Sequence, residues 1–178
     1  MNKKVLGWTI AGALALGTAA SFSPLIFAEK PSLECTINEK GEKEFGKVIK
    51  IESLAQMKAY LNQSEIAVLG FGPDGWTSPS KKIDYQALAG KFKTVPFLYV
   101  EFEKHKVLHN IYNPAKGFDI YVYIDGKNVP GSDSFSRYVE PGWGLEFYIE
   151  NYQLNKKKEF DQISYNSFKK KKKEEENK

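Results

Sequence analysis

The chain has 178 residues, of which 42% are hydrophobic, 14% aromatic and 27% charged, with a formal net charge of +4. This length suits one domain and the apolar content excludes global disorder, while the single Cys35 excludes an intrachain disulfide framework and a multi-cysteine metal site. The excess of positive charge lies at the two ends, and residues 29–155 carry 15 basic and 17 acidic groups. We therefore expect no nucleic-acid surface on the folded part.

Residues 1–28 are typical of an export signal. Lys3 and Lys4 precede a long apolar run, and Pro24 and the small Ala28 stand just before a polar stretch. We expect cleavage after Ala28, and the small residues 18–20 offer an earlier site. The alternative is an uncleaved anchor, because the apolar run is long enough to span a bilayer. Both interpretations export the domain, which would then be secreted or associated with the cell envelope.

Residues 29–45 form a polar N-terminal segment without a predicted element. After it, the alternation in residues 47–51 predicts a short strand. Ser53 then begins a helix whose first turn has the form of a capping box. Three apolar side chains share one face of this helix: Leu54, Met57 and Leu61.

The middle of the chain continues the alternation of strand and helix. The apolar run 65–71 predicts a buried strand, and the stretch 95–103, rich in aromatic and β-branched residues, predicts another. Between them, a helix is expected to start at Pro79. Its core face would consist of Ile83, Ala87, Leu88 and Phe92.

The last part of the predicted domain contains a short helix over 106–112, a hairpin and a closing helix. Asp125-Gly126 joins two strand-like runs, 119–124 and 127–129, and such a pair accepts the positive φ angles of a tight type I′ turn. A helix over 143–154 has four residues on one face: Leu145, Tyr148, Ile149 and Tyr152. The order β-α-β-α-β-α-β-β-α predicts a mixed central sheet covered by helices on both faces.

Residues 155–178 form a charged, low-complexity tail. The run Lys169–Lys173 is followed directly by three glutamates, and this pattern predicts a solvated, disordered segment. The lysines would attract a membrane or an anionic envelope polymer weakly, because the neighbouring acids reduce their field.

One segment resembles a known active site. The stretch Trp76-Thr-Ser-Pro-Ser-Lys81 is similar to the Trp-Cys-Gly-Pro-Cys-Lys segment of thioredoxins, and Thr77 and Ser80 stand where the two cysteines would be. The resemblance also covers the order of elements over residues 46–154. It implies a thioredoxin-like three-layer α/β/α sandwich. The cis-proline that the family places before its fourth strand has no counterpart in residues 116–120.

The resemblance implies a scaffold without redox catalysis, because hydroxyl groups cannot perform the disulfide exchange of a cysteine pair. It also implies that the surface around the old active site serves as a binding surface for a protein or peptide partner. The residues expected on that surface are Gly75, Trp76, Thr77, Ser78, Phe118 and Asp119. The alternative is a thiol–disulfide oxidoreductase, or an accessory redox protein, that acts through Cys35 and a thiol of its partner.

We expect no cofactor and no metal. His105 and His109 are four residues apart, but the His-Glu-x-x-His pattern of a helical zinc site is absent. The hydroxyls of Thr77 and Ser80 have no histidine nearby in sequence to activate them as nucleophiles, so we expect them to lie at the start of a helix.

Overall fold

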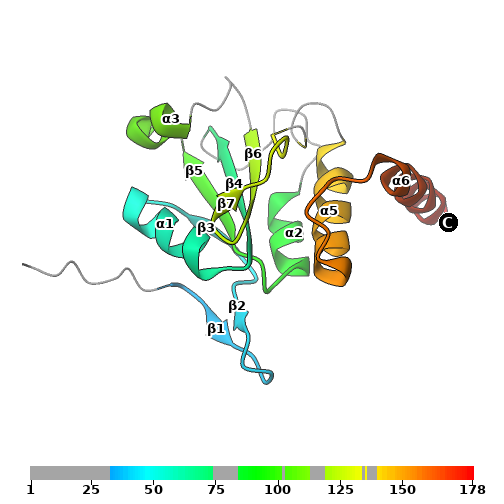
Figure 1. Cartoon of the computed structure of the whole chain (residues 1–178), viewed down its shortest axis with the longest axis horizontal. Coiled ribbons are helices and arrows are strands. Elements are labelled where there is room, and N and C mark those ends of the chain that lie inside the picture. Colours follow the sequence, from blue (N-terminus) through cyan, green and yellow to red (C-terminus); the bar gives the residue numbers. More distant parts are fainter. Residues whose placement is uncertain (1–32, 74–83, 102, 113–118, 134, 136–139) are drawn as a thin grey trace, which may run out of the picture.

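The computed structural model describes all residues except 1–32, 74–83, 102, 113–118, 134 and 136–139 (Figure 1). A small two-stranded sheet consists of β1 (Thr36–Ile37) and β2 (Lys43–Glu44). The strands of the main sheet are β3 (Val48–Lys50), β4 (Ile66–Gly72), β5 (Phe97–Glu101), β6 (Asp119–Ile124) and β7 (Lys127–Asn128). The helices are α1 (Leu54–Gln63), α2 (Tyr85–Lys91), α3 (Lys106–Tyr112), α5 (Pro141–Asn155) and α6 (Gln162–Glu176).

The main sheet has the strand order β3-β5-β4-β6-β7. Strands β3, β5 and β4 are parallel, whereas β6 runs antiparallel to β4, and β7 antiparallel to β6. At the centre of the sheet, Val68 of β4 lies opposite Phe97 on one side and Val122 on the other. Helices cover both faces, so the predicted three-layer α/β/α sandwich with a mixed sheet is confirmed (Figure 1).

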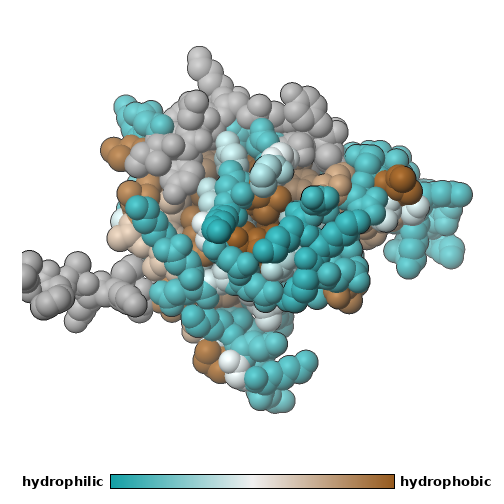
Figure 2. All heavy atoms as spheres, in the orientation of Figure 1, coloured by the Kyte–Doolittle hydropathy of each residue, from teal (hydrophilic) through white to brown (hydrophobic). Residues whose placement is uncertain are grey.

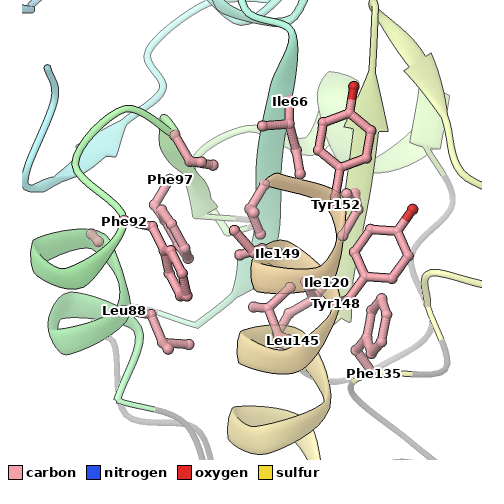
Figure 3. Close-up of a cluster of buried hydrophobic side chains, with 14 of the residues drawn as sticks. Ile66, Leu88, Phe92, Phe97, Ile120, Phe135, Leu145, Tyr148, Ile149 and Tyr152 are labelled. Atoms are coloured by element: carbon pink, nitrogen blue, oxygen red, sulfur yellow. The ribbon is translucent and has the colours of Figure 1, made fainter. Parts of the chain in front are cut away.

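One hydrophobic core lies between the sheet and the helices α2 and α5 (Figure 3). All four residues predicted on the inner face of α5 are buried: Leu145, Tyr148, Ile149 and Tyr152. The prediction for α2 is wrong at Ala87, which is exposed. Asp84 caps this helix by accepting a hydrogen bond from the Ala87 N–H at 2.8 Å. The buried face therefore follows the spacing that starts at Tyr85, and it continues through Leu88, Ala89 and Phe92.

The second core lies on the other face of the sheet, under α1 and α3. The predicted cap of α1 is confirmed, because the Ser53 hydroxyl accepts a hydrogen bond from the Gln56 N–H at 3.1 Å. Met57 and Leu61 are buried, and Leu54 packs at the margin of the same cluster. Each strand of the sheet centre is thus buried on both faces, as expected of strands that read as continuous apolar runs.

The predicted turn between β6 and β7 is confirmed by its backbone angles. Asp125 and Gly126 have φ angles of 50° and 73°, which a type I′ turn requires. A side chain at Gly126 would also place its Cβ 2.8 Å from Oδ1 of Asn62 on α1. Because Asn62 is exposed and its amide can move, glycine is favoured there by its conformation rather than by its size.

Two segments differ from the sequence predictions. Strands β1 and β2 form within the polar segment that we expected to lack elements. The tail expected to be disordered contains α6, so that expectation is wrong for residues 162–176. Asp161 caps α6 through the N–H groups of Ile163 and Ser164, both at 3.1 Å. The helix is stabilised by packing on α5, which its lysine-rich sequence does not reveal.

The contacts between α6 and α5 are both aromatic and ionic. Tyr165 and Phe168 lie with their ring centroids 5.8 and 5.3 Å from that of Phe147. Lys172 Nζ lies 3.1 Å from the buried carboxylate of Glu146, which also binds Lys91 of α2 at 2.5 Å. Glu146 thus connects three helices. No helix in the described part of the chain is both long enough and apolar enough to cross a membrane.

Candidate functional site

The edge where the resemblance places the site is formed by the ends of three central strands. The parallel strands β4 and β5 end there, β6 begins there, and α2 starts on the same side (Figure 1). We call this the C-terminal edge of the sheet. Five of the six predicted binding residues lie outside the described residues: Gly75, Trp76, Thr77, Ser78 and Phe118.

The sixth predicted residue, Asp119, lies at this C-terminal edge. It is the first residue of β6, stands opposite Phe71 in the antiparallel register, and is only 2% exposed. Beneath it, the rings of Phe71 and Tyr121 form an edge-to-face pair with centroids 5.8 Å apart. The strand that carries Asp119 is therefore held by both backbone pairing and aromatic packing.

Two tyrosine hydroxyls fix the backbone of the two strands that end at this edge, one just after β4 and one within β5. Tyr99 donates a hydrogen bond to the carbonyl oxygen of Pro73, directly after β4. Tyr85 donates to the carbonyl oxygen of Leu98 at 3.0 Å, and its burial raises the pKa of this hydroxyl well above the ordinary value. Tyr85 therefore acts as a neutral hydrogen-bond donor that positions backbone and is not suited to acid–base chemistry near neutral pH.

A shallow hollow lies beside the edge, between the start of α1 and the start of α3. Its volume is about 340 Å³, and His105, Leu108 and Glu52 are among its lining residues. His105 Nε2 lies 3.5 Å from Glu52 Oε2, and the exposed Val107 stands next to this pair. Sequence reasoning missed this hollow, because its two walls are about 50 positions apart in the chain.

The buried Glu101 marks the end of β5 and the start of the wall around this hollow. Its side chain binds Lys104 Nζ at 2.8 Å, while its carbonyl oxygen accepts a hydrogen bond from the His105 N–H at 3.0 Å. The described residues contain no group of three or more His, Cys, Asp and Glu side chains that could hold a metal ion. The side chain of His109 is not described.

The single cysteine lies far from the C-terminal edge. Cys35 is half-buried against the cluster that contains Phe45 and Tyr60. The Phe45 N–H donates to the carbonyl oxygen of Lys93 at 2.7 Å, and Lys93 precedes β5. This contact fixes the segment at the end of the sheet where the parallel strands begin. We call that end the N-terminal edge, and the thiol therefore lies at the opposite end of the sheet from Asp119.

The strand order and directions, together with the helices on both faces, agree with the thioredoxin-like sandwich that the sequence resemblance implies. The solved structures to which the chain is similar include several thioredoxins. A thioredoxin from Trypanosoma brucei brucei is 19% identical, covers 62% of this chain and 95% of its own, and gives a TM-score of 0.47. Oxidised thioredoxin from Plasmodium falciparum is 22% identical, covers 59% and 97%, and gives 0.44.

A third similar structure is a cysteine-to-serine mutant of a thioredoxin from Entamoeba histolytica. It is 24% identical, covers 46% of this chain and 80% of its own, and has a TM-score of 0.41. No protein-family model and no curated protein matches the chain. All three similarities are below 25% identity and give no information on the chemistry of this chain.

Proposed function

We propose that this chain is an exported, thioredoxin-like domain that binds a protein or peptide partner at the C-terminal edge of its sheet and does not catalyse disulfide exchange. Export is supported by the charged, apolar and small-residue order of residues 1–28. Partner binding is supported by an edge that combines a fixed backbone with an adjoining hollow and the exposed side chain of Val107.

The observation that carries the proposal is the position of the only cysteine. Disulfide exchange requires a thiolate that can approach a sulfur of the substrate, and a second thiol to resolve the mixed disulfide. Cys35 is half-buried at the N-terminal edge, and the segment Trp76–Lys81 contains hydroxyl side chains in place of both cysteines. A partner bound at the C-terminal edge would therefore meet no thiol of this chain.

The competing hypothesis is a redox function through Cys35 and a thiol of the partner. It rests on Cys35 being a free cysteine in a protein that we propose is exported. Such a function would need a binding surface at the N-terminal edge rather than at the C-terminal one. The two hypotheses therefore place the partner at opposite ends of the sheet.

An insulin-reduction assay with dithiothreitol distinguishes the two hypotheses. We expect the wild type and a Cys35→Ser variant to give the same rate as dithiothreitol alone. Cys35-dependent turnover would contradict a non-catalytic role. A thioredoxin with its cysteine pair intact serves as the positive control.

Partner binding is tested by affinity capture from the cell-envelope fraction, with wild type, Trp76→Ala and Gln63→Ala proteins. Gln63 is an exposed residue at the end of α1, close to the N-terminal edge, and is the matched control. We expect a partner that is retained by wild type and Gln63→Ala and lost with Trp76→Ala. A partner lost with Gln63→Ala and kept with Trp76→Ala would overturn the proposed surface.

The lysine run of α6 concerns a second proposed contact, with an anionic envelope polymer or a membrane surface. Lys169 and Lys172 bind Glu140 and Glu146, whereas Lys170 and Lys171 are exposed. Only part of the run is thus available to an anionic envelope polymer or a membrane surface. We propose a contact that is weak and sensitive to salt.

A further inference from the structure

A second hollow lies away from the C-terminal edge, on the face where β7 and the segment between α5 and α6 run side by side. Its volume is about 680 Å³, within the range of small-molecule sites. The apolar side chains that line it are Ile124, Val129, Pro130, Phe135, Tyr148 and Phe160. Figure 2 shows brown, hydrophobic atoms at the bottom of a depression bordered by teal, hydrophilic side chains at the centre of this face.

The wall formed by the hairpin and the turn after it is held by backbone hydrogen bonds. The Val129 N–H donates to the carbonyl oxygen of Val122 at 2.8 Å, and the Ser132 N–H donates to that of Val129 at 3.1 Å. Gly131, with a φ of 77°, allows the chain to turn between them. This wall is thus formed without a ligand.

The opposite wall is fixed by α5. The Tyr148 ring lies beside that of Phe135 (Figure 3), and its hydroxyl donates a hydrogen bond to the carbonyl oxygen of Lys158 at 2.6 Å. Phe160 packs edge-on against Phe135, with ring centroids 5.6 Å apart. The segment between α5 and α6 is therefore held across α5 by these contacts, and it forms the second wall of the hollow.

Two hydroxyl groups in these walls already have partners. Besides the Tyr148 hydroxyl, the Ser132 hydroxyl donates to Oδ1 of Asn128 at 3.0 Å. A polar ligand would have to replace these hydrogen bonds, whereas a hydrocarbon chain would only displace water from apolar surface. The interior thus favours an apolar group.

The mouth of the hollow carries charges. Lys158 lies 3.4 Å from Asp125, and both are largely exposed. Lys127, which is also exposed, makes no ion pair with any described residue. Glu159 stands at the mouth as well and opposes the binding of an anion. A ligand with one anionic end could pair with Lys127 while its hydrocarbon part lies in the hollow.

We propose that this hollow binds an aliphatic carboxylate of the medium-chain fatty-acid class, with the hydrocarbon against Val129, Phe135 and Phe160 and the carboxylate beside Lys127. This site is separate from the proposed partner surface, and it does not depend on the proposed function. The crossing of the segment after α5 supplies one of its two walls, so the site depends on that extension of the chain.

The test is a calorimetric titration of the full chain with decanoate below its micellar concentration. We expect saturable binding at one site, weakened about threefold in Lys127→Gln, as expected for the loss of one exposed charge pair, and strengthened in Glu159→Gln. Val129→Trp fills the hollow from a half-buried position and should weaken binding about tenfold or more. Lys43→Gln at the N-terminal edge is the matched control and should bind as wild type.

Methyl NMR spectra of the wild type keep the test valid if Val129→Trp does not fold. Decanoate should shift the methyl resonances of Ile124 and Val129, and leave those of Leu54, the first residue of α1, unchanged. The absence of saturable binding would overturn the proposal. Unchanged affinity in a folded Val129→Trp variant, or shifts that leave Ile124 and Val129 unaffected, would overturn it equally.

Discussion

The two edges of the central sheet differ in the kinds of side chain that the fold gathers there. At the C-terminal edge, Tyr99 and Glu101 hold the ends of parallel strands, and the chain supplies no thiol. At the N-terminal edge lie the half-buried Cys35 and an ionic network in which Glu65 accepts hydrogen bonds from Tyr152 and Lys156. The single thiol of the sequence therefore lies at the opposite end of the sheet from Asp119.

A fold can therefore be present without the chemistry that other proteins perform on it. The backbone of the C-terminal edge is fixed by contacts that need no cysteine, such as the Phe71–Tyr121 pair. This edge is therefore a preformed surface even though the chain has no cysteine pair there. Four sets of substitutions test the difference between the two edges.

The largest expected effect is a gain of activity at the C-terminal edge. The double substitution Thr77→Cys and Ser80→Cys restores the cysteine spacing of the resembled motif, and it should raise insulin reduction about tenfold or more above the wild type. The rate should not change when Cys35→Ser is added to the double variant. A double variant as inactive as the wild type would argue against a thioredoxin-like arrangement of residues 76–81.

The next effect compares core aromatics at the two edges. Phe71 is fully buried and packs edge-on against Tyr121, so Phe71→Ala should lower the free energy of unfolding by about 3–5 kcal/mol. Phe45 packs against Tyr60 and is 8% exposed, so Phe45→Ala should lower the free energy of unfolding by less than Phe71→Ala does. Urea denaturation measures both values. An equal or larger loss at Phe45 would show that the N-terminal edge is the more tightly packed one.

The N-terminal edge should also respond to alkali. Burial, followed by the hydrogen bond to Glu65, raises the pKa of Tyr152 from 10.0 to about 12. Because the folded state favours the neutral phenol, this stabilisation is complete below pH 10.0 and is lost as the pH rises towards about 12. Thermal unfolding across this range should show a shallower decline in Tyr152→Phe than in wild type. Parallel declines would mean that the network does not couple to folding.

The smallest expected effect concerns Lys156, which ends α5 in the left-handed region with a φ of 53°. Lys156→Gly removes strain worth about 1 kcal/mol and an exposed ion pair worth about 0–1 kcal/mol, so its stability should stay close to wild type. Lys156→Gln keeps the strain and loses the pair, and it should be less stable than Lys156→Gly by about 1 kcal/mol. Urea denaturation of both variants measures the difference. Equal stabilities would mean that the backbone angle costs little here.

Much of the fold could be predicted, because its signals are local. Asp125-Gly126 specifies its turn through backbone angles, and the buried face of α5 follows from a spacing within 15 residues. Strands β1 and β2 have two residues each, too few to give a periodic pattern. Their pairing depends on the turn between them and on the contact between Phe45 and Lys93.

The long-range features could not be predicted for a physical reason. Helix α6 depends on Tyr165 and Phe168 meeting Phe147, which lies about 20 positions earlier and does not belong to the predicted inner face of α5. The lysines dominate the sequence pattern and conceal these two rings. Of the predicted site, only Asp119 lies among the described residues, where it is buried as the first residue of β6. The second hollow could not be predicted, because one of its walls depends on the path of the chain after α5, and no local sequence pattern encodes this path.

The link that Glu146 makes between α2, α5 and α6 has a practical consequence for where this protein can be shortened. An expression boundary at Asn155 follows the end of α5, but it would uncover Phe147 and remove Lys172 from a buried carboxylate. An aromatic surface opened in this way favours self-association. A soluble fragment should therefore extend through the whole of α6. A C-terminal purification tag is better attached after Glu176 than to a fragment that ends before Asp161.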